Sequence, residues 1–290
     1  MKALVIGTTS VVLLAVGPAI AADMPLKGPS AARAFTWAGC YGGINGGGIG
    51  GDQNDFRTAP SGRYLTPAGA AAPPNAGGTG LLAGDIAQTT RSHNADDWGW
   101  TAGVQVGCNA QSTANFVAGV EADFNYSSLK KSVLDVFPQV PSVSGGFAIG
   151  PEAVAIESKI QWFSTARLRA GFAFDRLWLY GTGGIAVADV KTSTAVAFGF
   201  PTAGTPVLGG AVHAGSDTQT RVGFAVGGGL EYAFGNNWSL KAEYLYVNLG
   251  SERHDVPLIA PGGVASGYSW SNTDRLRENI VRAGINYKFW

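Results

Sequence analysis

The segment Gly181–Ala186 combines residue types that could bind a nucleotide. Its glycines at 181 and 183 and the alanine at 186 match the G-x-G-x-x-A fingerprint of dinucleotide sites; Gly46, Gly48 and Gly51 form a second, weaker match. That chemistry requires a helix directly afterwards, whose N-terminus holds the pyrophosphate. Alternating β-branched residues follow instead, so we interpret the segment as a strand and expect no cofactor.

The three histidines, His93, His213 and His254, are the candidates for acid–base catalysis. Each lies in a segment that we expect to be a long loop, and the nearby aspartates that could act as partners are Asp96, Asp97, Asp217 and Asp255. The chain has neither a G-x-S-x-G nor an H-E-x-x-H motif, and no fixed spacing of nucleophile and base. Because histidines in exposed loops are usually solvated, we expect no catalytic residue and no metal site.

The composition narrows the class of protein. Glycine supplies 43 of 290 residues, charged residues make up 14%, and Lys+Arg balance Asp+Glu at 20 each. A net charge of zero gives no electrostatic reason to bind nucleic acid. A hydrophobic content of 46% excludes disorder, and beyond the N-terminus no apolar run reaches the ~18 residues of a membrane helix. This composition indicates an all-β protein.

The first 21 residues predict export from the cytoplasm. Lys2 supplies the positive start, Ala3–Val16 the apolar region, and Ala19–Ala21 a small-x-small cleavage site after Pro18. The apolar stretch is too short for a transmembrane helix. We therefore expect residues 1–21 to be a cleaved signal peptide and residues 22–36 to be a disordered lead-in.

From residue 37 onward, segments of about ten residues alternate between apolar and polar side chains, which is the pattern of strands. In 116–126, Phe116 and Val120 lie on one face and Glu121 on the other. In 159–172 the pattern places Ile160 and Trp162 on the apolar face. The remaining segments are 221–232, 238–247 and 281–289, with looser alternation in 97–109 and 177–190 and a nearly all-glycine segment at 38–50.

The connections between these segments alternate in length. Short polar turns at 111–115, 174–176 and 235–237 separate long Gly/Pro/Ala/Ser stretches at 51–96, 131–157, 192–219 and 250–275. This pattern predicts an eight-stranded antiparallel up-and-down β-barrel over residues 37–290, with four long loops, three short turns and both termini at the short-turn end.

Alternation alone does not say whether the apolar face points inward, as in a lipocalin-like carrier, or outward into lipid. Three features favour lipid: polar faces of mixed charge that could fill a lumen, aromatic residues at strand ends, and a chain that ends on its last strand. The charged residues are Glu121, Asp123, Arg167, Arg169, Glu231, Lys241, Glu243 and Arg282. The aromatic residues are Trp37, Phe116, Phe172, Trp178, Phe234 and Trp238. We expect the crowded lumen also to hold Gly181, Gly183, Gly223, Gly227 and Gly284.

The opening segment Phe35–Gly43 and the closing segment Glu278–Phe289, with the internal pieces Gly181–Gly184 and Leu240–Tyr246, resemble a known family. It is that of the small proteobacterial outer-membrane β-barrel proteins of the OmpA/Opa-like kind. The resemblance implies an integral outer-membrane protein that contacts lipid and lipopolysaccharide. It also implies that the barrel assembly machinery reads the C-terminal pattern of Ile285, Tyr287, Phe289 and Trp290.

Cys40 and Cys108 are the only cysteines of an exported chain, which suggests a disulfide. Both lie near the short-turn ends of the first two strands. Cys108 falls on the outward face, and the resemblance implies that Cys40 does so too. We therefore expect a Cys40–Cys108 bond; the alternative is two small reduced residues in lipid.

The function expected from the sequence is structural rather than enzymatic, namely the surface display of long loops on a barrel whose lumen is filled by charged and glycine residues. The resemblance implies a role in envelope integrity as well. The alternative is a small passive diffusion channel like a porin; an outer-membrane hydrolase and a soluble lipocalin-like carrier are weaker alternatives. No motif identifies a ligand, and the sequence leaves open whether the chain forms a homo-oligomer.

Overall fold

The computed structural model describes residues 35–51, 56–62, 83–95, 97–112, 115–138, 140–141, 148–149, 151–198, 212–260 and 263–289. The predicted signal peptide and residues 22–34 of the predicted lead-in lie outside the described residues.

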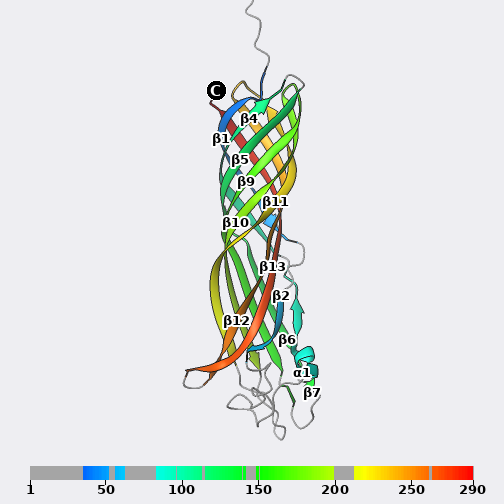
Figure 1. The fold of residues 1–290 in the computed structure, drawn as a ribbon, viewed down its shortest axis with the longest axis vertical. Helices are drawn as coiled ribbons and strands as arrows, with labels where there is room; N and C mark the ends of the chain where they lie inside the picture. The colour runs from blue at the N-terminus through cyan, green and yellow to red at the C-terminus, as the bar shows by residue number, and fades with distance from the viewer. Residues whose placement is uncertain are drawn as a thin grey trace, which may run out of the picture. The chain divides into compact units, whose positions relative to one another are not determined.

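Within these residues, eight strands form a closed antiparallel ring (Figure 1). The ring consists of β1 (Gly39–Gly50), β4 (Trp98–Gln111), β5 (Phe116–Ser127), β9 (Glu152–Phe174), β10 (Leu177–Phe198), β11 (Val212–Ala233), β12 (Trp238–Ala260) and β13 (Gly263–Lys288). Each strand pairs with the next, and β13 pairs with β1 to close the ring, so no strand edge is left open there. The predicted eight-stranded up-and-down barrel is confirmed.

The segment predicted as a strand rather than a nucleotide loop, Gly181–Ala186, lies in β10, and no helix follows it. The helix among the described residues is α1 (Ala83–Thr89). No helix in this part of the chain is long and apolar enough to cross a membrane.

The strands β9 to β13 continue far beyond the ends of β1, β4 and β5. Three shorter strands join this extension: β2 (Phe56–Gly62) pairs with β13, β3 (Arg91–His93) pairs with β2, and β6 (Lys130–Phe137) pairs with β9. A separate short pair is formed by β7 (Val140–Pro141) and β8 (Ala148–Ile149). The expectation that 131–157, 192–219 and 250–275 are loops was therefore wrong for most of each segment.

Side-chain polarity inverts between the ring and its extension. In the ring part of β12, Leu240 and Tyr244 are exposed on the outside while Lys241 and Glu243 are buried inside. In the extension of the same strand, Val256 and Leu258 are buried and Arg253 and Asp255 are exposed. An apolar exterior suits lipid and a polar exterior suits water, so the inversion marks the edge of the lipid-facing belt.

The length of the apolar belt matches a bilayer. Along β12 its outward side chains run from Trp238 to Tyr246, and along β13 they run from Val281 to Phe289. A tilted strand needs about 9–11 residues to cross the hydrocarbon layer. The belt therefore has the height that the predicted membrane span requires.

A β-bulge on β9 changes which face each residue occupies. Trp162 pairs with Asp189 and Ile160 pairs with Val190, which leaves Gln161 as the extra residue. The prediction that Ile160 and Trp162 share the apolar face was wrong, because the bulge turns Ile160 into the interior, where it is buried.

Cys40 and Cys108 form a disulfide across the directly paired strands β1 and β4. We expect iodoacetamide under denaturing, non-reducing conditions to leave the intact mass unchanged. Reduction followed by the same treatment should add two carbamidomethyl groups to the chain. Alkylation of both cysteines before reduction would contradict the bond.

Candidate functional site

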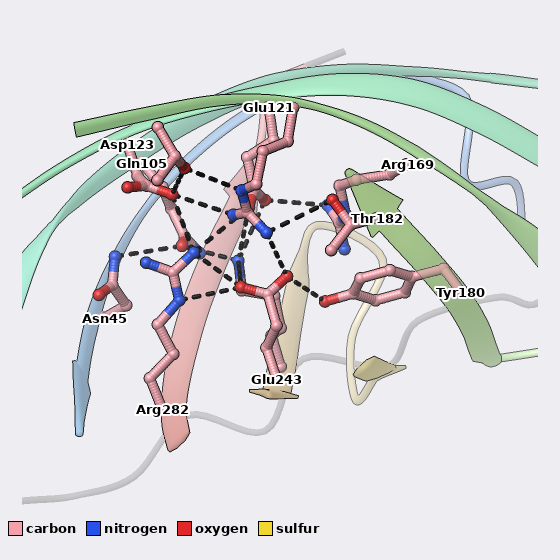
Figure 2. A network of polar contacts seen from close by, with 12 residues as sticks. Asn45, Gln105, Glu121, Asp123, Arg169, Tyr180, Thr182, Glu243 and Arg282 are labelled. Atoms are coloured by element: carbon pink, nitrogen blue, oxygen red, sulfur yellow. Dashed lines mark hydrogen bonds and ion pairs between the residues drawn. The ribbon is translucent and has the colours of Figure 1, made fainter. Parts of the chain in front are cut away.

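The eight charged residues predicted to face the lumen all lie inside the barrel and are buried. They come from five strands of the ring, β5, β9, β11, β12 and β13. Each side chain is buried because it occupies an inward position in the alternating pattern of its strand. Figure 2 shows most of them converging on one another from opposite walls. We call these eight residues the lumen network.

Glu121 lies at the centre of the lumen network. Its carboxylate accepts hydrogen bonds from Tyr41 Oη and Arg167 Nη2, both at 2.6 Å. Lys241 Nζ donates at 2.9 Å and Arg169 Nη1 at 3.0 Å. One carboxylate therefore faces three cations and a phenol in a space closed to water.

A second group of contacts joins β5, β9, β12 and β13. Arg282 Nη2 lies 2.8 Å from Asp123 Oδ2 and 2.7 Å from Glu243 Oε2. Arg167 also reaches both carboxylates, with Nη2 2.9 Å from Asp123 and Nη1 3.1 Å from Glu243. Asp123 and Glu243 are thus bridged by two guanidinium groups (Figure 2).

Glu231 completes the network toward the short-turn end. It accepts from Arg169 Nη2 at 2.7 Å, Ser239 Oγ at 2.5 Å and Asn286 Nδ2 at 2.8 Å. With this residue the network contains four carboxylates and four cations, so its net charge is zero. This balance matters because an uncompensated buried charge is strongly destabilising.

Several neutral residues that bind the network were missed in the sequence. Tyr41 and Tyr180 donate to Glu121 and Glu243, and Gln105 accepts from Lys241 Nζ at 2.8 Å. Alternation could have found the inward position of Tyr41, since this residue directly follows Cys40, which was expected to face outward. A tyrosine ring is compatible with either face of a membrane strand, because its hydroxyl can also donate a hydrogen bond to a buried carboxylate.

Aromatic side chains close the barrel at the short-turn end. Trp178 is 0% exposed and packs against Trp37, with ring centroids 5.7 Å apart, and against Tyr180, at 4.8 Å. The Arg169 guanidinium lies 4.4 Å from the centre of the Trp178 ring. A neighbouring cavity beside Trp37 measures about 20 Å³, which is room for about one water molecule.

The predicted aromatic girdle was therefore wrong for Trp37 and Trp178. Trp178 shares its inward face with Tyr180 and Thr182, and Trp37 precedes the first strand and turns into the barrel end. The other four predicted girdle residues are exposed on the outside: Phe116, Phe172, Phe234 and Trp238.

Glycines allow the strands to approach inside the barrel, but not all those expected there are inward. A Cβ on Gly223 or Gly227 would lie about 2 Å from a backbone oxygen of β12, at 1.9 and 2.0 Å, and one on Gly284 would meet β1. A Cβ on Gly181 or Gly183 would make only ordinary van der Waals contact with β11, at 4.0 and 3.8 Å, and both glycines share the outward face with Leu179 and Ile185. Their placement in the lumen was wrong.

Further layers fill the interior beyond the lumen network. Apolar side chains from β1, from β9 to β13 and from the connection between β5 and β6 form the next layer: Ile49, Leu129, Ile160, Phe163, Ala186, Ala188, Val190, Ala225, Leu245, Val247, Leu249, Leu276 and Ile280. The buried pair Lys131 and Glu278, 3.0 Å apart, lies at this level. In the extension a second apolar cluster surrounds Val133, Val256 and Trp270.

The histidines do not lie in solvated loops, so that expectation was wrong. His93 in β3 is buried, with Nε2 3.1 Å from Thr58 Oγ1 and Nδ1 2.5 Å from Asp135 Oδ2. This order of hydroxyl, imidazole and carboxylate is that of a catalytic triad. Thr58, however, is 0% exposed, so its hydroxyl is covered.

The other two histidines also face the interior of the extension. His213 is buried beside Trp270. His254 lies between Asp217, 3.2 Å from Nδ1, and Arg221 Nη2, 3.2 Å from Nε2. Of the other predicted partners, Asp255 forms an exposed pair with Arg253, Asp97 accepts from the Ser132 amide, and Asp96 lies outside the described residues.

Burial lowers the pKa of His213 from 6.5 to about 4. The unfolded chain therefore takes up a proton below pH 6.5 that the folded barrel does not, and stability falls as the pH drops from 6.5 toward 4. We expect His213→Gln to remove up to about 1.4 kcal/mol of this loss per pH unit. Urea unfolding of both proteins at pH 7 and pH 5 measures it; a stability difference between the two that does not change with pH would contradict the assignment.

The C-terminal pattern lies on the last strand of the ring. Ile285, Tyr287 and Phe289 alternate along the outward face, while Trp290 lies outside the described residues. In the described part of the chain, no group of three or more His, Cys, Asp or Glu side chains could hold a metal ion.

The family model and the curated relatives that match this chain are all outer-membrane proteins. Residues 29–289 match the family described as outer membrane protein beta-barrel domain. The chain is 35% identical over 278 residues to the 31 kDa outer-membrane immunogenic protein of Brucella melitensis, covering 93% of each chain. It is 29% identical over 192 residues to a 22 kDa outer membrane protein of Rhizobium leguminosarum, covering 66% of this chain and 67% of that protein.

Among solved structures, the chain is similar to the outer membrane protease OmpT of Escherichia coli, with a TM-score of 0.45 and 12% identity over 89% of this chain and 99% of that one. It is also similar to the outer membrane protein OprG of Pseudomonas aeruginosa, with a TM-score of 0.41 and 10% identity over 88% and 99% of the two chains.

Proposed function

Because this chain belongs to the family of outer membrane protein β-barrel domains and is located in the outer membrane, we propose that it is a closed structural barrel. In this proposal it supports the integrity of the envelope and displays its long-loop end at the cell surface. It neither conducts solutes nor catalyses a reaction.

The observation that carries this proposal is the filled interior. Aromatic rings around Trp178, the neutral lumen network and an apolar layer around Leu245 and Ile280 follow one another along the barrel. A passive channel needs a continuous water-filled path, and eight strands enclose a space that side chains can fill. The buried ions here bind one another and leave little capacity for a passing solute.

Display at the surface is supported by the long extension of β9 to β13. Outer-membrane barrels place short turns in the periplasm and long loops outside the cell. The exterior of the extension carries exposed charged side chains such as Arg253, Asp255 and Glu157. The Brucella relatives are named immunogenic outer-membrane proteins, which is consistent with an exposed end.

The remaining contacts of the proposal follow from the outward faces. The apolar belt supports contact with lipid and lipopolysaccharide. The outward row of Ile285, Tyr287 and Phe289 on the last strand supports recognition by the barrel assembly machinery.

A deletion strain of the source bacterium tests the proposed role. We expect loss of the protein to increase leakage of a periplasmic marker enzyme and sensitivity to detergent, with uptake of small sugars and amino acids unchanged. Complementation with the wild-type gene should restore both phenotypes. Slower uptake of small solutes with an intact permeability barrier would instead indicate a channel.

A further inference from the structure

The wall of the barrel opens between β11 and β12 in the extension. Pairing of these strands stops at Phe224 and Asn248 and resumes at His213 and Leu258. Over the same residues β11 stays paired with β10, and β12 pairs with β13 from Ser251 to Pro257. In Figure 1 the yellow strand β11 bows away from its neighbours in this region.

Two residues of β12, Gly250 and Pro257, lie at the two ends of the opening. At the end nearer the ring, the pairing of β12 with β13 shifts between Asn248 and Ser251, around Gly250 with φ +76°. That left-handed conformation favours glycine and bends the strand at a bulge. At the end farther from the ring lies Pro257, which has no N–H to donate to a neighbouring strand.

A cavity of about 340 Å³ occupies the opening. Neutral hydrogen-bonding side chains line much of it: Thr192, Thr194, Ser216 and Gln219. Its charged side chains are Asp217, Asp255 and Arg253; Asp255 lies 3.4 Å from Arg253, and Asp217 lies 3.2 Å from the imidazole of His254. The lining therefore offers many donors and acceptors without a strong excess of either charge.

Buried groups behind the cavity hold its lining in place. Thr192 Oγ1 donates to Asp274 at 3.1 Å, and Asn272 Nδ2 donates to Thr194 at 2.8 Å. Arg221 binds Asp274 at 2.6 Å and also contacts His254. Such support fixes the direction of the lining hydroxyls and reduces the entropy lost on binding.

Two of these supporting groups keep unused hydrogen-bonding capacity. Within the described residues, Arg221 Nε and Nη1 and Asn272 Oδ1 are buried without a partner. Buried polar groups are normally satisfied, so each exception has room for a further hydrogen-bond partner. Here they adjoin residues that line the cavity, namely His254 and Thr194.

From this geometry we propose that the opening binds a neutral sugar, either free or as the terminal unit of a glycan. Sugar hydroxyls both donate and accept, which matches the mixed lining, and carboxylates such as Asp217 and Asp255 can accept from adjacent hydroxyls. Val256 and Pro257 supply an apolar surface for the C–H face of a ring. The volume lies at the small end of the ~300–1,000 Å³ typical of ligand sites, which suits one or two rings.

Saturation-transfer NMR on the full chain refolded in a zwitterionic detergent tests the proposal, because sugar-based detergents would compete. The panel contains glucose, galactose, mannose, N-acetylglucosamine, their common disaccharides and a neutral core oligosaccharide, with inorganic phosphate as an anionic comparison. We expect saturable binding of at least one sugar and none of phosphate. Binding of the oligosaccharide alone would identify a glycan end as the ligand.

Two substitutions and a matched control locate the site. Asp217→Asn should weaken binding roughly tenfold and Thr194→Val a few-fold, because each removes a hydrogen-bonding group from the lining. Thr218→Val alters an exposed neighbour that does not line the cavity and should leave binding unchanged. The proposal is overturned if the folded protein binds no sugar, if it binds phosphate instead, or if both lining variants bind as the wild type does.

Discussion

Replacement of Glu121 by Gln is expected to lower the free energy of unfolding by about 3–5 kcal/mol. The carboxylate accepts from Arg167, Arg169 and Lys241, and these cations lie in an interior closed to water. An amide keeps the shape but removes the negative charge, which leaves the lumen network with an uncompensated positive charge. Urea unfolding of the barrel refolded into lipid vesicles, followed by tryptophan fluorescence and gel mobility, measures the loss.

Glu157→Gln is the matched control for this prediction. Glu157 forms a single ion pair with Lys130, at 2.9 Å, and both side chains are about half exposed, so the expected loss is under about 1 kcal/mol. The double variant Glu121→Gln, Lys241→Met restores a neutral network and should recover part of the stability. A loss under 1 kcal/mol in Glu121→Gln itself would show that the network is hydrated rather than sealed.

The variant Leu168→Arg is expected to destabilise the barrel in a bilayer by about 2–4 kcal/mol. Leu168 is 67% exposed on the outside of β9, between Trp162 and Phe174, and so lies near the middle of the apolar belt. A guanidinium at that depth is removed from water without a partner. Unfolding in lipid vesicles measures the effect.

Ala155→Arg places the same side chain outward on the same strand, beyond the inversion of polarity. Ala155 is exposed in the extension, so its substitution should change the unfolding free energy by less than about 0.5 kcal/mol. Equal effects at both positions would contradict the membrane boundary drawn from the inversion.

The strands of the ring could be predicted because the physical constraint on them is simple. In lipid every outward side chain must be apolar, and this gives segments such as 116–126 and 281–289 a regular period of two. The extension was missed because its alternation inverts, and because Gly250, Pro257 and the neighbouring Gly- and Pro-rich stretches of the sequence have the composition of loops. A bulge at Gln161 also cannot be read from alternation, since it is defined by its partner strand.

For the interior, the charge of a residue and its position in the alternating pattern of its strand were sufficient to select all eight members of the lumen network. The pairing among them was not predictable, since Glu121 meets Lys241 only when the sheet closes into a ring. Trp37 and Trp178 were misplaced because an aromatic residue at a strand end can lie outside at the membrane interface or inside, where it closes the end of the barrel. The histidines were misplaced for a related reason, since a supposed loop carries no information about which side chains it buries.

Single-channel recording in a planar bilayer tests the filled lumen most directly. The refolded protein is first shown to be folded by its shifted gel mobility before boiling and is then inserted into the bilayer. A pore-forming peptide added afterwards is the positive control, which shows that conductance steps can be detected in the same membrane. A lumen filled by the Trp178 closure, the ion network and the apolar layers predicts no discrete conductance steps. Reproducible, ohmic steps from the folded protein would contradict it.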